Sequence, residues 1–423
     1  MLKLFFTYLF ICFSLMYANG QQEKHLHASC HTDQLMQDIQ NRDPKIEVEY
    51  QLFKKQHQIK SSDITPSRRN VITIPVIVHV IHSGEAVGSG SNLSMSRVIE
   101  QIDILNQDYG FTNADRQNIP DYFSSDVGDT NIQFCLIQKT PTGEAHPGVN
   151  RVLYNNIPDI KYIEDVIKKN TIWNPVKFLN IWVVQIPSQG ILGYSYLPIP
   201  SILHTHKDGV VIDTDKFGIV GSQIKGRTAT HEVGHYLGLH HPWGTVESCS
   251  SDDGISDTPN CRGPYFGCPS PPQFSCGSID MSMNFMDYVN DPCMYMFSKG
   301  QGTLMHQILG NERSALNNGA PFICDLQLTN NQEVENIDGP RVYPNPSYGH
   351  IVIEDTKGFE NETVLVELFT LSGKKVFDQN HRFIENEQII NINLTSFNSG
   401  TFVLKMTSKH AHFTEKIVLI TGG

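Results

Sequence analysis

Residues 226–244 read GRTATHEVGHYLGLHHPWG, and this stretch constrains the fold more than any other. His231 and His235 stand four residues apart in a His-Glu-x-x-His pattern, so a helix would place both side chains on one face. Gly238 can end that helix in a left-handed conformation and turn the chain so that His241 reaches the same point. The pattern predicts a helix and a tight return that bring three imidazoles together.

Three converging imidazoles indicate a catalytic zinc site, because they leave a fourth position open for water. Glu232 lies beside the ligands, where its carboxylate can hold a zinc-bound water, take its proton and pass it to a leaving amine. A helix with satisfied core histidines is the alternative, and His240 could replace the third ligand. The spacing favours His231, His235 and His241 as ligands, with Glu232 as the catalytic base.

Apolar segments before this stretch predict a mixed α/β domain. VITIPVIVHVI (71–81), NIQFCLI (131–137) and FLNIWVVQI (178–186) are rich in β-branched and aromatic residues, which is typical of buried strands. Residues 94–110 place apolar side chains at helical spacing and end at Gly110. Strand, helix, strand and strand in this order favour a mixed sheet with packed helices.

The N-terminal and C-terminal segments differ in composition from the central region. The first residues, MLKLFFTYLFICFSLMYANG, combine an early lysine, an apolar stretch and small residues before Gln21, which is typical of a secretory signal peptide. A membrane anchor is the alternative, but the apolar stretch is short for a span. The following polar segment ends in Arg68-Arg69, a plausible processing site. Beyond LTNNQEVENIDGP, short strands separated by turn residues predict a small all-β sandwich. We therefore expect a signal peptide (1–20), a pro-segment (21–69), a catalytic domain (70–325), a linker (326–340) and a C-terminal domain (341–423).

The composition argues against some classes of binding partner. The formal net charge of −12 and the pI of about 5.8 argue against nucleic acid, whose binders carry a basic footprint. No apolar run after the N-terminus approaches the length of a transmembrane helix.

The cysteines fit an exported protein. Cys12 would leave with the signal peptide, and five of the other cysteines crowd between residues 249 and 293. In an exported chain such a cluster indicates disulfides that staple a loop-rich region. A cysteine zinc site is the alternative, but no paired C-x-x-C spacing occurs.

The extended histidine motif resembles that of the metzincin metalloproteases. Within them, the chain resembles the pappalysin family, with its ulilysin- and mirolysin-like enzymes, from about Ile74 to Leu316. The resemblance rests on IPVIVHVI, LGYSYLP, DGVVID, GRTATHEVGHYLGLHHPWG, SDTPN, FGCP and NFMDYVNDPCMYMFSKGQ. It implies a secreted zinc endopeptidase with a metzincin-type α/β (α+β) catalytic domain, built from an active-site helix and a mixed sheet.

The resemblance also assigns roles within the cleft. Met286 would form the methionine turn beneath the metal without coordinating it, and Tyr288 would stabilise the oxyanion of the tetrahedral intermediate. LGYSYLP would present an extended edge to which the substrate backbone adds as a strand. Family members often prefer a basic residue after the scissile bond. Here Met294 follows Cys293, and the nearby acidic candidate is Asp291.

Further metal and disulfide sites follow from the same resemblance. It implies calcium at DDGISDTP, bound by the Asp253 side chain and by the carbonyls of Ser256 and Thr258. A solvated acidic turn is the alternative. The implied disulfides are Cys249–Cys276 and Cys268–Cys293, which leaves Cys261 either to pair with Cys135 or Cys324 or to stay free.

The pro-segment contains SCHTDQL, which is similar to a short motif of related zymogens. Either the thiolate of Cys30 or the carboxylate of Asp33 could occupy the open zinc position until cleavage near Arg68-Arg69. Alternatively, Cys30 only joins a disulfide.

The C-terminal segment resembles the type IX secretion sorting domain of the Bacteroidetes. Its markers are VYPNPSYG, LFTLSGKKVF, INLTSFNSGTFVLKM and EKIVLI. The resemblance implies export by the type IX machinery, to the medium or to the outer-membrane surface. An immunoglobulin-like adhesive module is the alternative, and either reading predicts an immunoglobulin-like sandwich.

Two function classes are compatible with these patterns. The first is an active endopeptidase that acts on proteins or peptides, and the second is a secreted binding or adhesion protein on an inactive protease scaffold. The presence of Glu232 favours the first, because losing the base is the easiest way to abolish hydrolysis. Another zinc hydrolase, such as an amidase, conflicts with the methionine turn and LGYSYLP together.

Overall fold

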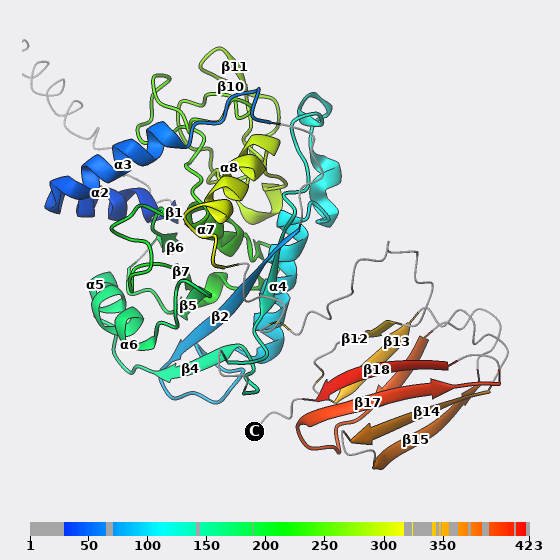
Figure 1. The fold of residues 1–423 in the computed structure, drawn as a ribbon. Helices are drawn as coiled ribbons and strands as arrows, with labels where there is room; N and C mark the ends of the chain where they lie inside the picture. The colour runs from blue at the N-terminus through cyan, green and yellow to red at the C-terminus, as the bar shows by residue number, and fades with distance from the viewer. Residues whose placement is uncertain are drawn as a thin grey trace, which may run out of the picture. The chain divides into compact units, whose positions relative to one another are not determined.

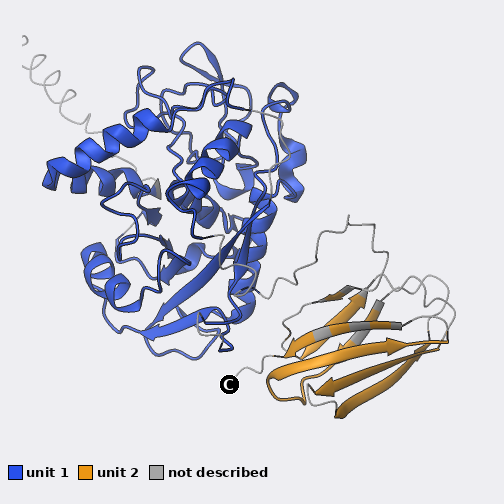
Figure 2. Cartoon of the chain, in the orientation of Figure 1, with its two compact units in different colours: residues 1–328 blue, residues 329–423 orange. Residues whose placement is uncertain are grey.

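The computed structural model describes two compact units, residues 1–328 and 329–423 (Figure 2). The described residues are 29–64, 71–140, 144–188, 190–316, 324, 341–343, 347, 349–354, 363–370, 374–382, 389–409 and 412–419. The expected signal peptide, the processing site at Arg68-Arg69 and the expected linker lie outside them.

A seven-stranded mixed sheet forms the centre of the first unit (Figure 1). β2 (Ile72–His82) pairs in parallel with β5, and it pairs with β3 along its first half and with β4 along its second half. The antiparallel pair is β6 with β7. The spatial order is β1 (Ser29–Cys30), β6 (Ile191–Ser195), β7 (Val210–Asp213), β5 (Leu179–Val184), β2 and β3 (Ile132–Leu136), with β4 (Val149–Leu153) also beside β2.

The continuous apolar runs in β2 and β5 are explained by their place in this sheet. Every residue of β5 is buried, as is the interior of β2, because helices and loops cover both faces of a parallel sheet. The helix expected over 94–110 is α4 (Met95–Tyr109), which begins at Ser94, whose hydroxyl accepts from the Arg97 N–H at 3.2 Å. α4 packs against α7 (Arg227–Tyr236), and α7 packs on β6 and β7.

The first unit also contains further helices and two small hairpins. Its other α-helices are α2 (Thr32–Arg42), α3 (Pro44–Gln56), α5 (Ile160–Tyr162), α6 (Lys169–Thr171) and α8 (Lys299–Gly310). A π-helical turn spans Ile163–Lys168, and 3-10 turns span Ala114–Asn118, Asp121–Phe123, Thr214–Lys216 and Asp291–Cys293. Two small hairpins are β8 (Ile219–Val220) with β9 (Ile224–Lys225), and β10 (Gln273–Ser275) with β11 (Ser278–Asp280).

Part of the expected pro-segment is folded onto the sheet, which the sequence did not predict. β1 adds to the edge of the sheet in parallel with β6, with Ser29 opposite Ile191 and Cys30 opposite Gly193. α2 and α3 follow it and appear in blue in Figure 1. Farther on, the Ile59 N–H donates to the Gly254 carbonyl at 2.8 Å, and Ile59 is buried. The segment is therefore anchored at two separate places.

Disulfides tie down the irregular region after α7. They join Cys249 with Cys276, Cys268 with Cys293, and Cys135 with Cys324. Of the cysteines that the structure describes, Cys261 and Cys30 carry no disulfide. The third pair connects β3 to the end of the unit, which the spacing alone had left open.

The second unit is the predicted all-β sandwich. One sheet contains β12 (Arg341–Tyr343), β13 (His350–Glu354) and β16 (Ile389–Asn393), and the other β15 (Lys375–Arg382), β14 (Thr363–Thr370), β17 (Gly400–Thr407) and β18 (His412–Leu419), each in spatial order. Buried residues of both sheets, such as Ile351, Ile392, Val366, Leu404 and Ile417, form one core.

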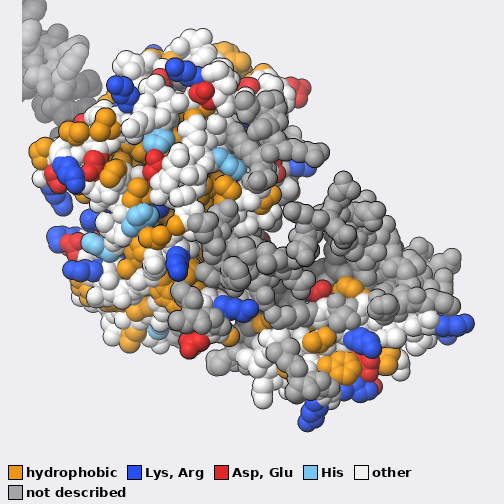
Figure 3. Space-filling view, viewed as in Figure 1, with side chains coloured by type: hydrophobic (Ala, Val, Ile, Leu, Met, Phe, Trp, Pro, Cys, Tyr) orange, Lys and Arg blue, Asp and Glu red, His pale blue; other side chains and the backbone are white. Residues whose placement is uncertain are grey.

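The surface mixes charges of both signs. On the face in Figure 3, acidic and basic side chains of the described residues are interspersed. None of the helices in the described part of the chain has the length and apolar character to span a bilayer.

Candidate active site

Helix α7 and the turn after it bring together the three predicted zinc ligands. α7 follows Gly226, which has a φ of 76°, and Asp291 accepts from the Lys225 N–H at 2.7 Å and the Arg227 N–H at 3.0 Å. These bonds satisfy amide donors at the start of the helix. Gly238 has a φ of 93°, and the chain turns there so that His241 faces the helix.

Each imidazole is oriented by an acceptor at its Nδ1 atom. His231 Nδ1 lies 2.8 Å from the Phe285 carbonyl, and His235 Nδ1 lies 2.8 Å from the Leu239 carbonyl. His241 Nδ1 lies 2.8 Å from Asp33 Oδ2. Such partners hold the proton on Nδ1 and leave the Nε2 lone pair free to bind a metal.

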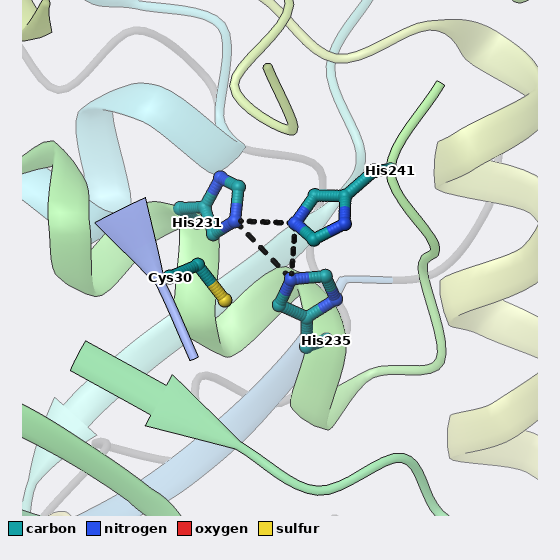
Figure 4. Close-up of side chains that lie close together, drawn as sticks. All are labelled: Cys30, His231, His235 and His241. Atoms are coloured by element: carbon teal, nitrogen blue, oxygen red, sulfur yellow. Dashed lines mark hydrogen bonds between the residues drawn. The ribbon is translucent and has the colours of Figure 1, made fainter. Parts of the chain in front are cut away.

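The three Nε2 atoms face one another at the spacing of a tetrahedral metal site (Figure 4). Their separations are 3.1 Å and 3.2 Å, and a tetrahedron with zinc–nitrogen bonds of about 2.05 Å has edges of about 3.3 Å. Burial lowers the pKa of His231 to about 3, so the ring is neutral. Three buried lone pairs directed at one point need a cation between them, and the residues therefore fit zinc.

The two latency candidates occupy different places. Cys30, His231, His235 and His241 each offer one ligand atom, and these four atoms all lie within 4.8 Å of one another. Among the described residues, this is the one group of three or more His, Cys, Asp or Glu side chains that could hold a metal ion. Figure 4 shows the Cys30 thiol directed towards the imidazoles. Asp33 instead lies on the outer, Nδ1 side of His241. The structure thus brings Cys30, and not Asp33, to the open corner.

Glu232, on α7, contacts Cys30 and Thr32 of the N-terminal segment. Its Oε2 atom lies 3.4 Å from Cys30 Sγ and 3.2 Å from Thr32 Oγ1, and Thr32 Oγ1 also accepts from the Ser195 N–H at 3.0 Å. Burial raises the pKa of Glu232 to about 8. Its Oε1 atom has no hydrogen-bond partner in the described part of the chain. Thr32, which sequence reasoning missed, therefore holds one carboxylate oxygen of the expected base.

Met286 packs against α7, the helix that carries His231 and His235. A Cβ atom added at Gly234 would come within 2.4 Å of Met286 Sδ, so a side chain at that helix position would force the methionine side chain to move. Tyr288 lies at the other side of the cluster, with its ring centroid 4.9 Å from that of His241 and its hydroxyl donating to the Cys30 carbonyl at 3.4 Å. Trp243, also missed, stacks on His241 at 4.6 Å.

The expected calcium residues lie on one tight loop. Asp253 is buried and accepts from the Ile255 N–H at 3.0 Å and from the Thr258 hydroxyl at 2.8 Å. Burial raises the pKa of the Asp253 carboxyl well above its ordinary value. The Ser256 N–H donates to the Ile59 carbonyl at 2.9 Å, so this loop also contacts the N-terminal segment that carries Ile59.

Comparisons with known proteins match this site. Residues 161–310 match the family model described as pregnancy-associated plasma protein-A, and residues 341–420 match a secretion system C-terminal sorting domain. An extracellular metalloprotease of Arthroderma otae is 32% identical over 253 residues, which covers 58% of this chain and 80% of the relative.

Solved structures are also similar to this chain. Mature mirolysin of Tannerella forsythia, in complex with a cleaved peptide, is 37% identical with a TM-score of 0.57, covering 60% of this chain and 99% of that one. A mutant of promirolysin from the same organism is 34% identical with a TM-score of 0.60, covering 70% of this chain and 98% of that one.

Proposed function

Because the chain belongs to the pappalysin family of metalloendopeptidases and carries a type IX secretion sorting domain, we propose that it is a secreted zinc endopeptidase made as a zymogen. The observation that carries the proposal is the meeting of three buried Nε2 atoms beside the carboxylate of Glu232. His231, His235 and His241 would hold the zinc. When bound, zinc polarises the scissile carbonyl and brings the pKa of a coordinated water to about 7.

Glu232 would act as the base and then as the acid. Its carboxylate would take the proton of the attacking water and return it to the leaving amine. Tyr288 would donate its hydroxyl to the developing oxyanion. In support of this role, that hydroxyl already donates to the carbonyl of Cys30, a main-chain carbonyl at the metal site.

Latency would depend on the segment 21–69. Cys30 would fill the fourth metal position, and Thr32 would occupy the Glu232 oxygen that a water needs. Asp33, the other candidate, would act only by orienting His241. Cleavage near Arg68-Arg69 would release these contacts and open the cleft.

We also propose calcium on the loop 253–258. Asp253 would ligate through its side chain, and Ser256 and Thr258 through their carbonyls. The supporting observation is a buried carboxylate with a raised pKa, which a cation would stabilise as an anion. Excess calcium should raise the melting temperature of the wild type and should not raise that of Asp253→Asn. Equal shifts in both proteins would count against the site.

A basic residue after the scissile bond is the specificity that the family resemblance implies, with Asp291 as its partner. The contacts of Asp291 weaken that assignment, since its Oδ2 atom already accepts two backbone N–H groups at the start of α7. The C-terminal unit would engage the type IX machinery and take no part in peptide hydrolysis.

The test uses protein cut after Arg69, loaded with zinc and incubated with a proteome-derived peptide library. Mass spectrometry would identify cleavage sites with and without a chelator, beside Glu232→Ala as the matched control. We expect chelator-sensitive cleavage that the variant lacks. Cleavage that persists in Glu232→Ala would show that Glu232 is not the base. Peptides that stay intact in every sample would favour a binding protein.

A further inference from the structure

The cleft contains one side-chain pocket next to the reacting groups. It has a volume of about 260 Å³, and Thr228, His231 and Glu232 line the side that belongs to α7. This is below the roughly 300–1,000 Å³ of small-molecule sites, a size that suits a single side chain. The segment after the methionine turn contributes Val289 and Met294, and Cys30 from the N-terminal segment also lines the pocket.

Four apolar side chains line the pocket beside its polar and charged residues. Leu192 and Ile224 line it together with Val289 and Met294, and the last two are buried. Removing apolar surface from water stabilises a complex by about 25 cal/mol per Å². An apolar substrate side chain would therefore gain more binding free energy in this pocket than a polar one.

Three carboxylates line the pocket: Glu232 is the proposed base, and Asp287 and Asp291 accept hydrogen bonds from backbone N–H groups. Asp291 accepts from two N–H groups at the start of α7, whose positive end offsets its charge. Asp287 Oδ1 accepts from the Tyr265 N–H at 2.8 Å and the Tyr288 N–H at 2.6 Å, and burial raises its pKa to about 8. The only cationic side chain among the described pocket residues is Lys216, which would repel a second cation.

The position of Leu192 indicates which substrate residue enters the pocket. β6 runs from Ile191 to Ser195, and Leu192 lies near its start. The pro-segment pairs with β6 in parallel, through β1. A substrate strand that pairs with β6 in the other, antiparallel direction would have its later residues beside Leu192. The pocket would then receive the residue that follows the scissile bond.

We propose that this enzyme cleaves before apolar residues of the size of leucine, methionine or phenylalanine, with Met294 as the specificity-determining residue of the pocket. The inference rests on the proposed endopeptidase function and names its substrate class. Met294 offers an arginine or lysine side chain no counter-charge, and the carboxylates of Asp287 and Asp291 already accept backbone N–H groups, so a substrate cation would have to compete with those groups for compensation.

The experiment compares peptides that differ only in the residue after the cut. For the wild type we expect kcat/KM for leucine to exceed that for arginine by about tenfold or more, since a charge that is only partly compensated costs at least that much. Met294→Asp should lower this ratio by about tenfold, because it supplies the missing counter-charge. Ser270→Asp, which adds the same charge at an exposed position outside the pocket, should leave the ratio unchanged.

The outcomes separate the inference from the proposed function. Chelator-sensitive cleavage with arginine or lysine enriched after the cut would leave the function standing and overturn the inference. A leucine-to-arginine ratio near one would overturn it as well. If no chelator-sensitive cleavage occurs, both fall. The wild-type measurement decides the matter even if Met294→Asp does not fold.

Discussion

Replacing Arg313 should strongly destabilise the first unit. The guanidinium is buried and donates to both oxygens of Asp208, at 2.7 Å and 3.0 Å, and to the Tyr236 carbonyl at 3.0 Å. It also lies 3.5 Å from the centroid of the Tyr236 ring. Tyr236 is the last residue of α7, so Arg313 fixes the end of the helix that carries two of the proposed ligands.

The magnitude follows from what Arg313→Met leaves behind. Asp208 is 1% exposed, so the variant would bury a carboxylate without its counter-charge. Breaking such a pair from one side costs about 3–5 kcal/mol, and a freed helix carbonyl adds about 1 kcal/mol. We therefore expect a loss of about 5 kcal/mol in the free energy of unfolding.

Urea unfolding followed by tryptophan fluorescence would measure this loss in the full chain. All three tryptophans, Trp173, Trp182 and Trp243, lie in the first unit, so the signal reports that unit alone. The matched control is Arg262→Met, an exposed arginine for which we expect a change within about 0.5 kcal/mol.

The double variant Arg313→Met/Asp208→Leu completes the test. It should be less destabilised than the sum of the single variants by about 2 kcal/mol, because it removes both charges. A loss below about 1 kcal/mol for Arg313→Met, or additivity of the two single changes, would refute the reasoning.

Three further predictions concern catalysis, latency and pH. Tyr288→Phe should lower kcat by about a hundredfold with little change in KM, and equal effects on both constants would argue against an oxyanion role. In uncut protein, Cys30→Ala should raise peptidase activity by about tenfold or more and Asp33→Asn by much less, and the opposite order would assign latency to the carboxylate. His79 is buried, its Nε2 atom lies 2.9 Å from Asn180 Oδ1, and burial lowers its pKa to about 4. Below pH 6.5 His79 is protonated in the unfolded chain but stays neutral in the folded chain. The free energy of unfolding should therefore fall by about 1.4 kcal/mol per pH unit as the pH drops towards 4. Urea melts of His79→Gln should show a shallower pH slope than the wild type, and equal slopes would exclude His79 as the source.

Several features of the fold could be predicted from the sequence because their signals are local. Dense apolar runs predicted the strands β2 and β5, and apolar residues at helical spacing over 94–110 predicted the helix α4. Short strand-like segments separated by turn residues predicted the strands of the second unit. In each case the pattern repeats within one element, so a few neighbouring residues are enough to recognise it.

The folded pro-segment could not be predicted in this way. Its helices are polar, and Thr32 gains its meaning only from Glu232, which lies 200 residues farther along the chain. The same holds for Asp33, which sequence reasoning offered as an alternative to Cys30 at the metal. Their three-residue spacing says nothing about which side of His241 each one reaches.

The sequence by itself determined the proposed metal ligands and the base, because a four-residue helical spacing and one left-handed glycine place them within a single helix and turn. Tertiary structure decided what surrounds them. The packing of Met286 Sδ against Gly234, the commitment of Asp291 to the start of α7, and the burial of Arg313 against Asp208 all join segments far apart in the chain. Such contacts depend on how whole elements pack in space, and no local periodicity records that packing.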